Sequence, residues 1–226
     1  FDGILTGFLS SEKQINIVLD FIKTFKRCGG DDKGTLLIVD PVMGDNGKLY
    51  SSYTPQLCRE MKKLLNSADV LTPNLTEACN LLDITYPKDG SISNEDLYQM
   101  CRKIASCRDS CYKGTMTIIV TGIDRGENIG NFIYENGLGK ILEFPKAGSE
   151  HSGTGDAFVA IVAASLVKDE SVESSVRKAA EFIEKSLIYT EQIGSAWNEG
   201  LCFEILFEKS FINTLFITKD HISWTA

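Results

Sequence analysis

The 226 residues include 43% apolar and 24% charged side chains, as in ordinary globular proteins with a packed core. A net charge of −8 argues against nucleic acid or an anionic membrane surface as a partner. No apolar run reaches the ~18 residues of a transmembrane helix, and no signal peptide opens the chain. We therefore expect a cytoplasmic protein whose residues 1–226 form one α/β domain.

Seven cysteines are scattered along the chain, an odd number that outlines no disulfide framework. Cys107 and Cys111 are close in sequence, but no histidine lies near them to complete a zinc site. We expect the thiols to be reduced, as is usual in the cytosol.

Strands and helices alternate along the first 120 residues. Continuous apolar runs predict buried strands at residues 3–8, 35–40, 70–72 and 116–120. Capping residues and helical spacing of apolar side chains predict helices at 12–26, 54–66, 76–82 and 94–106. Cys28-Gly29-Gly30 is expected to end the first of these helices.

A different pattern follows residue 120. Residues 130–134 and 140–144 read as two strands joined by the hairpin signal Glu135-Asn136-Gly137-Leu138-Gly139. Further helices are predicted from Asp156 to about residue 167, at 170–189 and at 201–207, and the tail 209–226 has no assignment. The order predicts an open, mostly parallel sheet with helices on both faces and an antiparallel edge hairpin.

The most informative motif is Gly153-Thr154-Gly155-Asp156, directly before an apolar helical run. A glycine-bracketed turn that opens a helix points several backbone N–H groups at one place, which attracts an anion. The carboxylate of Asp156 beside such a place is suited to take a proton from a group that attacks a phosphate. The alternative is a simple turn in which the aspartate caps the helix.

Polar residues also follow the other predicted strands, where ligands of open α/β sheets bind. Asp40 and Asp45 follow the second strand, Thr72, Asn74 and Glu77 follow the third, and Thr121-Gly122 follows the fourth. Each group has a structural alternative as a cap or a turn. Acids that gather with backbone donors at one sheet edge favour Mg²⁺ bound together with phosphates.

These motifs resemble those of the pyridoxal kinases of the ribokinase superfamily. The resemblance extends in order over about residues 1–208 and is carried by Thr6-Gly7-Phe8 with Ser10, Asp40-Pro41-Val42-Met43-Gly44-Asp45 with Gly47 and Leu49-Tyr50, Thr72-Pro73-Asn74 with Glu77-Ala78, and Gly153-Thr154-Gly155-Asp156. The related hydroxymethylpyrimidine kinases share some of these motifs and diverge after Met43.

The resemblance implies a ribokinase-like fold and ATP-dependent phosphorylation of the 5′-hydroxymethyl group of pyridoxal, pyridoxine or pyridoxamine. Asp156 would be the base, and Gly153, Thr154 and Gly155 would bind the transferring phosphoryl group. The remaining implied roles are Mg²⁺ at Asp40, Asp45 and Glu77, a monovalent cation near Thr72, ATP at Asp40, Asn74, Glu77, Thr121, Gly122, Thr154 and Ala147-Gly148-Ser149, and the pyridine ring at Phe8, Gly155 and Asp156.

The resemblance also implies a part of the family pattern that this sequence does not contain. A family member carries roughly a further third of chain before the position of Phe1, with substrate-binding side chains and much of the contact of a homodimer. We therefore expect weak or absent kinase activity from the 226 residues, with the nucleotide-binding half retained. A non-catalytic nucleotide-binding module and a hydroxymethylpyrimidine kinase are the alternatives.

Overall fold

A computed structural model describes residues 1–27, 34–108, 115–149, 151–196, 199–204 and 206. The predicted helix end at Cys28-Gly29-Gly30, the thiol of Cys111 and the unassigned tail 209–226 lie outside these residues. Within them, Cys58, Cys79, Cys101, Cys107 and Cys202 are free thiols.

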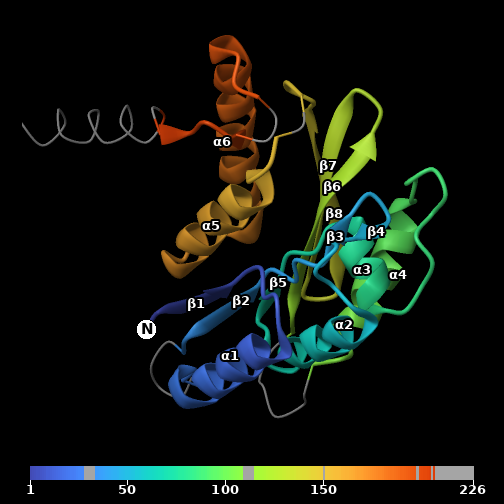
Figure 1. The fold of residues 1–226 in the computed structure, drawn as a ribbon, viewed down its shortest axis with the longest axis vertical. Helices are drawn as coiled ribbons and strands as arrows, with labels where there is room; N and C mark the ends of the chain where they lie inside the picture. The colour runs from blue at the N-terminus through green and yellow to red at the C-terminus, as the bar shows by residue number, and fades with distance from the viewer. Residues whose placement is uncertain (28–33, 109–114, 150, 197–198, 205, 207–226) are drawn as a thin grey trace, which may run out of the picture.

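A six-stranded sheet runs through the molecule in the order β1-β2-β5-β6-β7-β8 (Figure 1). The first four strands in this order are parallel, whereas β6, β7 and β8 form an antiparallel meander. The strands are β1 (Gly3–Thr6), β2 (Leu36–Val39), β5 (Val70–Leu71), β6 (Thr117–Arg125), β7 (Asn128–Glu135) and β8 (Leu138–Pro145). The mostly parallel sheet with an antiparallel edge hairpin is thus confirmed.

Helices cover both faces of the sheet (Figure 1). One face carries α1 (Glu12–Phe25), α2 (Pro55–Met61), α3 (Leu75–Leu81) and α4 (Asn94–Ala105), and the other carries α5 (Thr154–Val167) and α6 (Val172–Ile193). The strand period of two explains how one strand serves both layers. In β2, Leu37 and Val39 enter the core beneath α1–α4, and Ile38 enters the core beneath α5 and α6.

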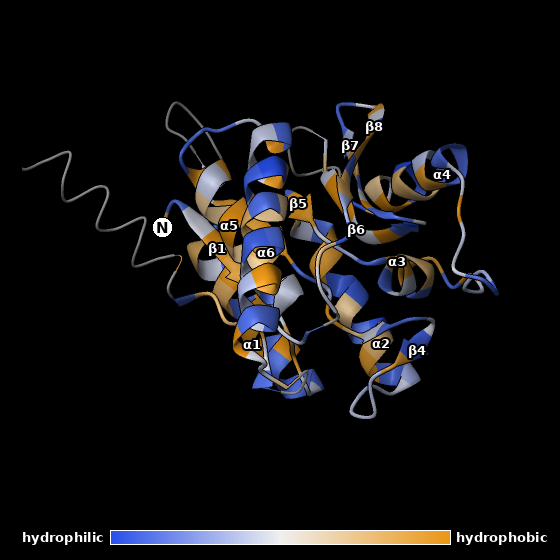
Figure 2. Ribbon diagram, turned by 90° about the horizontal axis from the view of Figure 1, so that it is seen from above, coloured by the Kyte–Doolittle hydropathy of each residue, from blue (hydrophilic) through white to orange (hydrophobic). Residues whose placement is uncertain are grey.

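Helices α5 and α6 differ in polarity although they pack against each other on the same face of the sheet, α5 beside β1 and α6 beside β7. α5 is apolar along most of its length. α6 turns Val172, Val176 and Ala179 inward and shows polar bands outward (Figure 2). The structure contains no helix in its described ranges that is both long and apolar enough to cross a membrane.

The structure differs from the sequence prediction in several places. The predicted helix 54–66 divides into α2 and a 3₁₀ helix η1 (Lys62–Ser67). Strand β6 continues past Val120 to Arg125, with an irregularity in its pairing with β7 between Val120 and Ile123. The helix predicted from residue 201 is wrong at its start, because residues 201–203 have no helical structure.

Candidate functional site

The first turn of α5 lacks the side-chain cap that the other α-helices have. The N-cap side chains of α1, α2, α3, α4 and α6 all accept a backbone N–H, and they are Ser11, Thr54, Asn74, Ser93 and Ser171. The N-cap of α5 is Gly153, with a φ of +88° and no side-chain hydrogen bond. Among the α-helices of the described ranges, only α5 leaves its first amides without such an acceptor, and such amides attract an anion.

Open space lies in front of this turn. A Cβ atom built on Gly153 or Gly155 would meet no other atom within 4 Å. Asp156 is exposed in the same turn, so the alternative in which this aspartate is the N-cap is wrong. A ligand can therefore approach the amides and the Asp156 carboxylate together.

Asp40 lies directly after β2 with its side chain buried, only 7% exposed. The hydroxyl of Thr72, which follows β5, donates to Oδ1 of Asp40 at 3.1 Å. Burial raises the pKa of Asp40 to about 7, the Thr72 hydrogen bond lowers it, and the negative charge of Asp156 raises it further. The structure thus brings together Asp40, Thr72 and Asp156 from three predicted strand and helix ends.

Glu77 forms a capping box with Asn74 at the start of α3. Its Oε2 accepts the Asn74 N–H at 2.8 Å, and its Oε1 accepts the Met43 N–H at 3.1 Å. Burial raises the pKa of Glu77 to about 8, the charge of Asp40 raises it next, and the two amide bonds lower it. The helix cap that was the structural alternative for this group is present at Asn74, and Glu77 also ties α3 to the loop that follows Asp40.

Asp45 lies in a small hairpin of β3 (Gly44–Asp45) and β4 (Lys48–Leu49). Asn46 and Gly47 form its turn with positive φ values of 49° and 75°. The amide of Asn74 donates from Nδ2 to the Gly44 carbonyl at 2.8 Å, which fixes the hairpin to α3. The turn predicted from the sequence is present, and it projects Asp45 near Glu77.

Thr121 and Gly122 were predicted to follow a strand, but they lie within β6 at its irregular pairing with β7. The Thr121 N–H donates to the Pro73 carbonyl at 2.9 Å, so Thr121 is beside Asn74. Gly122 has a φ of +69° and open space where a side chain would be. The sequence prediction missed this irregular pairing, because strand β6 continues through it to Arg125. Thr121 and Asn74, which were both predicted to lie in the site, are nevertheless neighbours.

The other two predicted contacts lie at the edge of this group. Residues 147–149 run along α6, where a Cβ on Gly148 would lie 3.2 Å from the Leu187 Cβ and 3.2 Å from the Glu191 Cδ. Phe8 is 50% exposed and packs its ring against Tyr53, with ring centroids 5.9 Å apart. These contacts do not involve the acids, so the binding roles of residues 147–149 and Phe8 stay predictions.

Tyr50 lies among the acids of the site, although its only mention in the sequence analysis was as part of the family resemblance. Burial raises its pKa first, and the charges of four carboxylates add to this effect: Asp45, Glu77, Asp156 and Asp40. Its backbone N–H donates to the Met43 carbonyl at 3.0 Å, which holds the end of the hairpin beside the acids. An aromatic residue three positions after a predicted acidic turn is too common a pattern to have identified it.

The acids fit a metal ion that arrives together with phosphates. No three histidine, cysteine or acidic side chains of the described ranges are grouped closely enough to hold an ion by themselves. Mg²⁺ usually takes one or two carboxylates, with phosphate and water as its other ligands. Both Glu77 oxygens already accept backbone N–H groups, which favours contact with a metal through water. Asp40 and Asp45 remain for closer contact.

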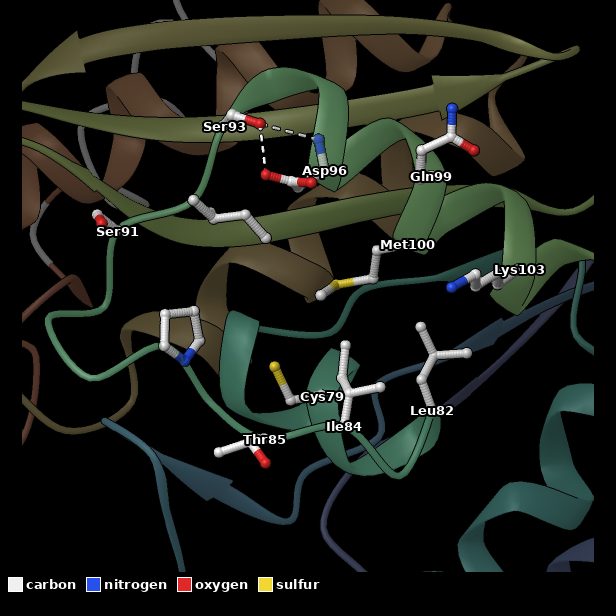
Figure 3. A pocket seen from close by; sticks show the side chains of 12 residues that line it. Cys79, Leu82, Ile84, Thr85, Ser91, Ser93, Asp96, Gln99, Met100 and Lys103 are labelled. Atoms are coloured by element: carbon white, nitrogen blue, oxygen red, sulfur yellow. Dashed lines mark hydrogen bonds between the residues drawn. The ribbon is translucent and has the colours of Figure 1, made fainter.

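A cavity of about 460 Å³ lies elsewhere, between α3, α4 and the segment that joins them (Figure 3). Met100 on α4 faces Leu82 and Ile84 across it, and Ser93, Asp96 and Lys103 lie at its rim. None of the predicted site residues lines this cavity. It is therefore separate from the acids at the carboxyl end of the sheet.

Comparison with known proteins identifies relatives over most of the chain. A model of the phosphomethylpyrimidine kinase family matches residues 1–200. A Schizosaccharomyces pombe protein provisionally named a pyridoxal kinase is 28% identical over 173 residues, or 73% of this chain and 46% of that protein. A hydroxymethylpyrimidine/phosphomethylpyrimidine kinase of Staphylococcus aureus N315 is 30% identical over 164 residues, with coverage of 70% and 54%. The chain thus spans about half the length of these curated relatives.

Solved structures show the same fold. A provisionally assigned phosphomethylpyrimidine kinase from Bacteroides thetaiotaomicron, crystallised with pyridoxal, has a TM-score of 0.79 and 31% identity, covering 92% of this chain and 70% of that one. Pyridoxal kinase from Lactobacillus plantarum also has a TM-score of 0.79, at 21% identity, covering 99% and 74%. The second likeness concerns the fold alone.

Proposed function

The chain belongs to the phosphomethylpyrimidine kinase family, and from this premise we propose that it transfers the γ-phosphoryl group of ATP to the 5′-hydroxymethyl group of a pyridoxal-type vitamer. The observation that supports this most strongly is the uncapped first turn of α5, which opens on space beside Asp156. The sequence motif alone left a structural cap as an alternative. The geometry favours an anion site with a carboxylate at its edge.

In the proposed reaction, the base, the phosphoryl-binding amides and the nucleotide-binding backbone come from different residues. The carboxylate of Asp156 accepts the proton of the substrate hydroxyl as its oxygen bonds to the γ-phosphorus and the bond to ADP breaks. The amides of Thr154, Gly155 and Asp156 donate to the phosphoryl oxygens, where negative charge must be stabilised. Thr121 and Gly122 provide backbone beside Asn74 along which the nucleotide phosphates lie.

Charge neutralisation is the second requirement of the site. Asp40 and Asp45 would hold Mg²⁺, with Glu77 acting through water, and Mg²⁺ when bound supplies positive charge to the phosphates. The raised pKa values of Asp40 and Glu77 reflect buried acids without a neighbouring cation among their causes. A metal–phosphate ligand would therefore relieve a repulsion that the ligand-free protein retains.

The second part of the proposal is the identity of the acceptor. Pyridoxal is favoured by the motif after Met43 and by the pyridoxal bound to the Bacteroides relative. Hydroxymethylpyrimidine is the second candidate, because the Staphylococcus aureus relative carries that activity in its name and the family model is named for the related phosphomethylpyrimidine. Both acceptors present a hydroxymethyl group on a flat nitrogen heterocycle, so the same base serves either.

The test combines product detection with a base variant. The protein is incubated with magnesium–ATP and, separately, with pyridoxal, pyridoxine, pyridoxamine or hydroxymethylpyrimidine, and products are identified by mass spectrometry. We expect phosphorylated pyridoxal-type product, formed at a low rate by the 226 residues, and Asp156→Asn should lower that rate about 10²–10⁴-fold. Nucleotide affinity, measured by calorimetry, should change less than about twofold in this variant, because the amides remain.

Each other outcome has a distinct meaning. Product from hydroxymethylpyrimidine alone would replace the acceptor and keep the kinase. Nucleotide binding without any product, unchanged by Asp156→Asn, would support a non-catalytic binding module. Absence of magnesium-dependent nucleotide binding would contradict the proposal altogether.

A further inference from the structure

Tyr86, in the segment between α3 and α4, lies against the tip of the β3–β4 hairpin. A Cβ atom on Gly47 would lie 2.8 Å from Cδ1, 3.1 Å from Cγ and 3.3 Å from Cε1 of the Tyr86 ring. Such close approach to three ring atoms means that the ring covers the backbone of the turn. Any side chain at position 47 would have to displace the ring.

The hairpin tip is held from a second side by Thr76 on α3. The N–H of Gly47 donates to the Thr76 hydroxyl oxygen at 2.8 Å. The turn is therefore enclosed between a hydrogen-bond acceptor and an aromatic ring. Gly47 has a φ of +75°, a conformation that glycine adopts readily because it has no side chain.

The other end of the Tyr86 ring is accommodated by its own segment. A Cβ atom on Gly90 would lie 3.0 Å from the Tyr86 hydroxyl oxygen. Gly90 has a φ of +70°, and its N–H donates to the Pro87 carbonyl at 3.0 Å. This local turn creates the space that the ring needs, so the segment is folded around Tyr86.

The neighbours of Tyr86 in the segment line a cavity that Tyr86 itself does not line. Thr85 and Pro87 line the cavity between α3 and α4, together with Ile84 and Ile92. The segment is therefore backed partly by a cavity rather than by continuous packing. Tyr86 packs against the core beneath α1–α4 and against the turn of the β3–β4 hairpin, so it links the two.

We propose that Tyr86 is a positioning residue that holds the β3–β4 hairpin in place and thereby sets Asp45 for phosphoryl transfer. Asp45 directly precedes the turn, and its Oδ1 accepts the Asn46 N–H at 2.8 Å, so the carboxylate moves with the tip. The part of this inference that concerns catalysis rests on the proposed function. The part that concerns the hairpin rests on the contacts alone.

Three variants separate positioning from general packing. Tyr86→Ala removes the ring, Tyr86→Phe keeps the ring and removes the hydroxyl, and Tyr98→Ala is the matched control. Tyr98 is a partly buried tyrosine whose ring packs on Tyr134, with centroids 5.6 Å apart, and whose hydroxyl donates to the Gly137 carbonyl at 3.1 Å. Neither interaction involves the β3–β4 hairpin, so Tyr98→Ala removes an aromatic ring and its hydrogen bond without touching that hairpin.

Hydrogen exchange tests the hairpin part without any need for enzyme activity. We expect amides of residues 44–50 to exchange at least about tenfold faster in Tyr86→Ala, with no such change in Tyr86→Phe or Tyr98→Ala. Equal exchange in Tyr86→Ala and the unaltered protein would overturn the inference, as would an equal increase in Tyr98→Ala. These results stand whether or not the protein is a kinase.

Steady-state kinetics tests the catalytic part. Tyr86→Ala should raise the KM for magnesium–ATP about tenfold and change kcat less than about twofold, because a misplaced Asp45 weakens binding of the metal–nucleotide. Tyr86→Phe should restore the KM of the unaltered protein. A KM that stays constant while exchange of the hairpin increases would overturn the role of Tyr86 in the reaction and leave the proposed kinase intact.

Discussion

Acids lie at both ends of the parallel strands, and their surroundings differ. Asp69, before β5, is partly buried and accepts hydrogen bonds from the Lys26 ammonium at 2.9 Å, the Arg108 guanidinium and the Leu37 N–H. At the carboxyl end, burial raises the pKa values of Asp40 and Glu77, and the charges of neighbouring acids raise them further. The first arrangement completes a network within the protein, and the second leaves charge for a ligand to neutralise. Among the described acids, raised pKa values thus mark the carboxyl end of the parallel strands, where the proposed site lies.

The largest expected effect on stability is at Asp69, which forms ion pairs with Lys26 and Arg108. Asp69→Asn should destabilise the protein by about 3 kcal/mol, because it removes the charge that compensates two cations whose side chains are only 5% and 7% exposed. Urea unfolding measures the change. A loss below about 0.5 kcal/mol would mean that the network is no more than a surface ion pair.

At the carboxyl end of the strands, removal of a buried carboxylate should increase the stability of the protein. Asp40→Asn keeps an acceptor for the Thr72 hydroxyl and removes a buried charge, so the ligand-free protein at pH 8 should gain about 1–3 kcal/mol. Kinase activity should be lost in the same variant. Destabilisation by Asp40→Asn at this pH would break the comparison between the two ends.

The pH dependence of stability follows from the same two carboxyl groups. Asp40 and Glu77 hold their protons more tightly in the folded chain, with pKa values of about 7 and 8 against 3.8 and 4.5 without the fold. Their contribution to stability is therefore complete below about pH 4 and is lost as the pH rises to about 8. Thermal unfolding from pH 5 to pH 8.5 should show this decline, and Asp40→Asn should reduce it. An unchanged slope in that variant would contradict the assignment.

A smaller effect is expected at the first turn of α5. Gly155→Ala places its Cβ in open space, and alanine favours a helix over glycine by up to about 1 kcal/mol, so stability should rise slightly. The same methyl group would occupy the space in front of the amides, so nucleotide affinity should fall. Calorimetric titration with magnesium–ADP checks this, and unaltered affinity would place the phosphates elsewhere.

The smallest expected effect is a coupling between Gly47 and Tyr86. Gly47→Ala strains the turn and also meets the ring, and only the second part disappears when Tyr86 is already alanine. A double-mutant cycle should therefore give a coupling of about 0.5–1 kcal/mol in the free energy of unfolding. Additive effects would show that the ring gives way freely and does not hold the turn.

The sequence predicted most of this architecture because its signals are local. Apolar runs marked the parallel strands, and Asn136-Gly137 marked the turn between β7 and β8. Acids after strand ends predicted the gathering of Asp40, Thr72 and Asp156, since parallel strands end at one edge. The bulge at Thr121-Gly122, the charges around Tyr50 and the contact of Tyr86 with Gly47 depend on tertiary neighbours. No pattern within one segment encodes them.

The most direct test of the account is calorimetric binding of magnesium–ADP at pH 8 to the unaltered protein, Asp40→Asn and Asp69→Asn, the last under conditions where it is folded. The account predicts binding by the unaltered protein and Asp69→Asn with affinities within about threefold of each other, and at least about a tenfold loss in Asp40→Asn. Equal affinity in Asp40→Asn and the unaltered protein would contradict the claim that the unsatisfied acids are kept for a metal–nucleotide ligand.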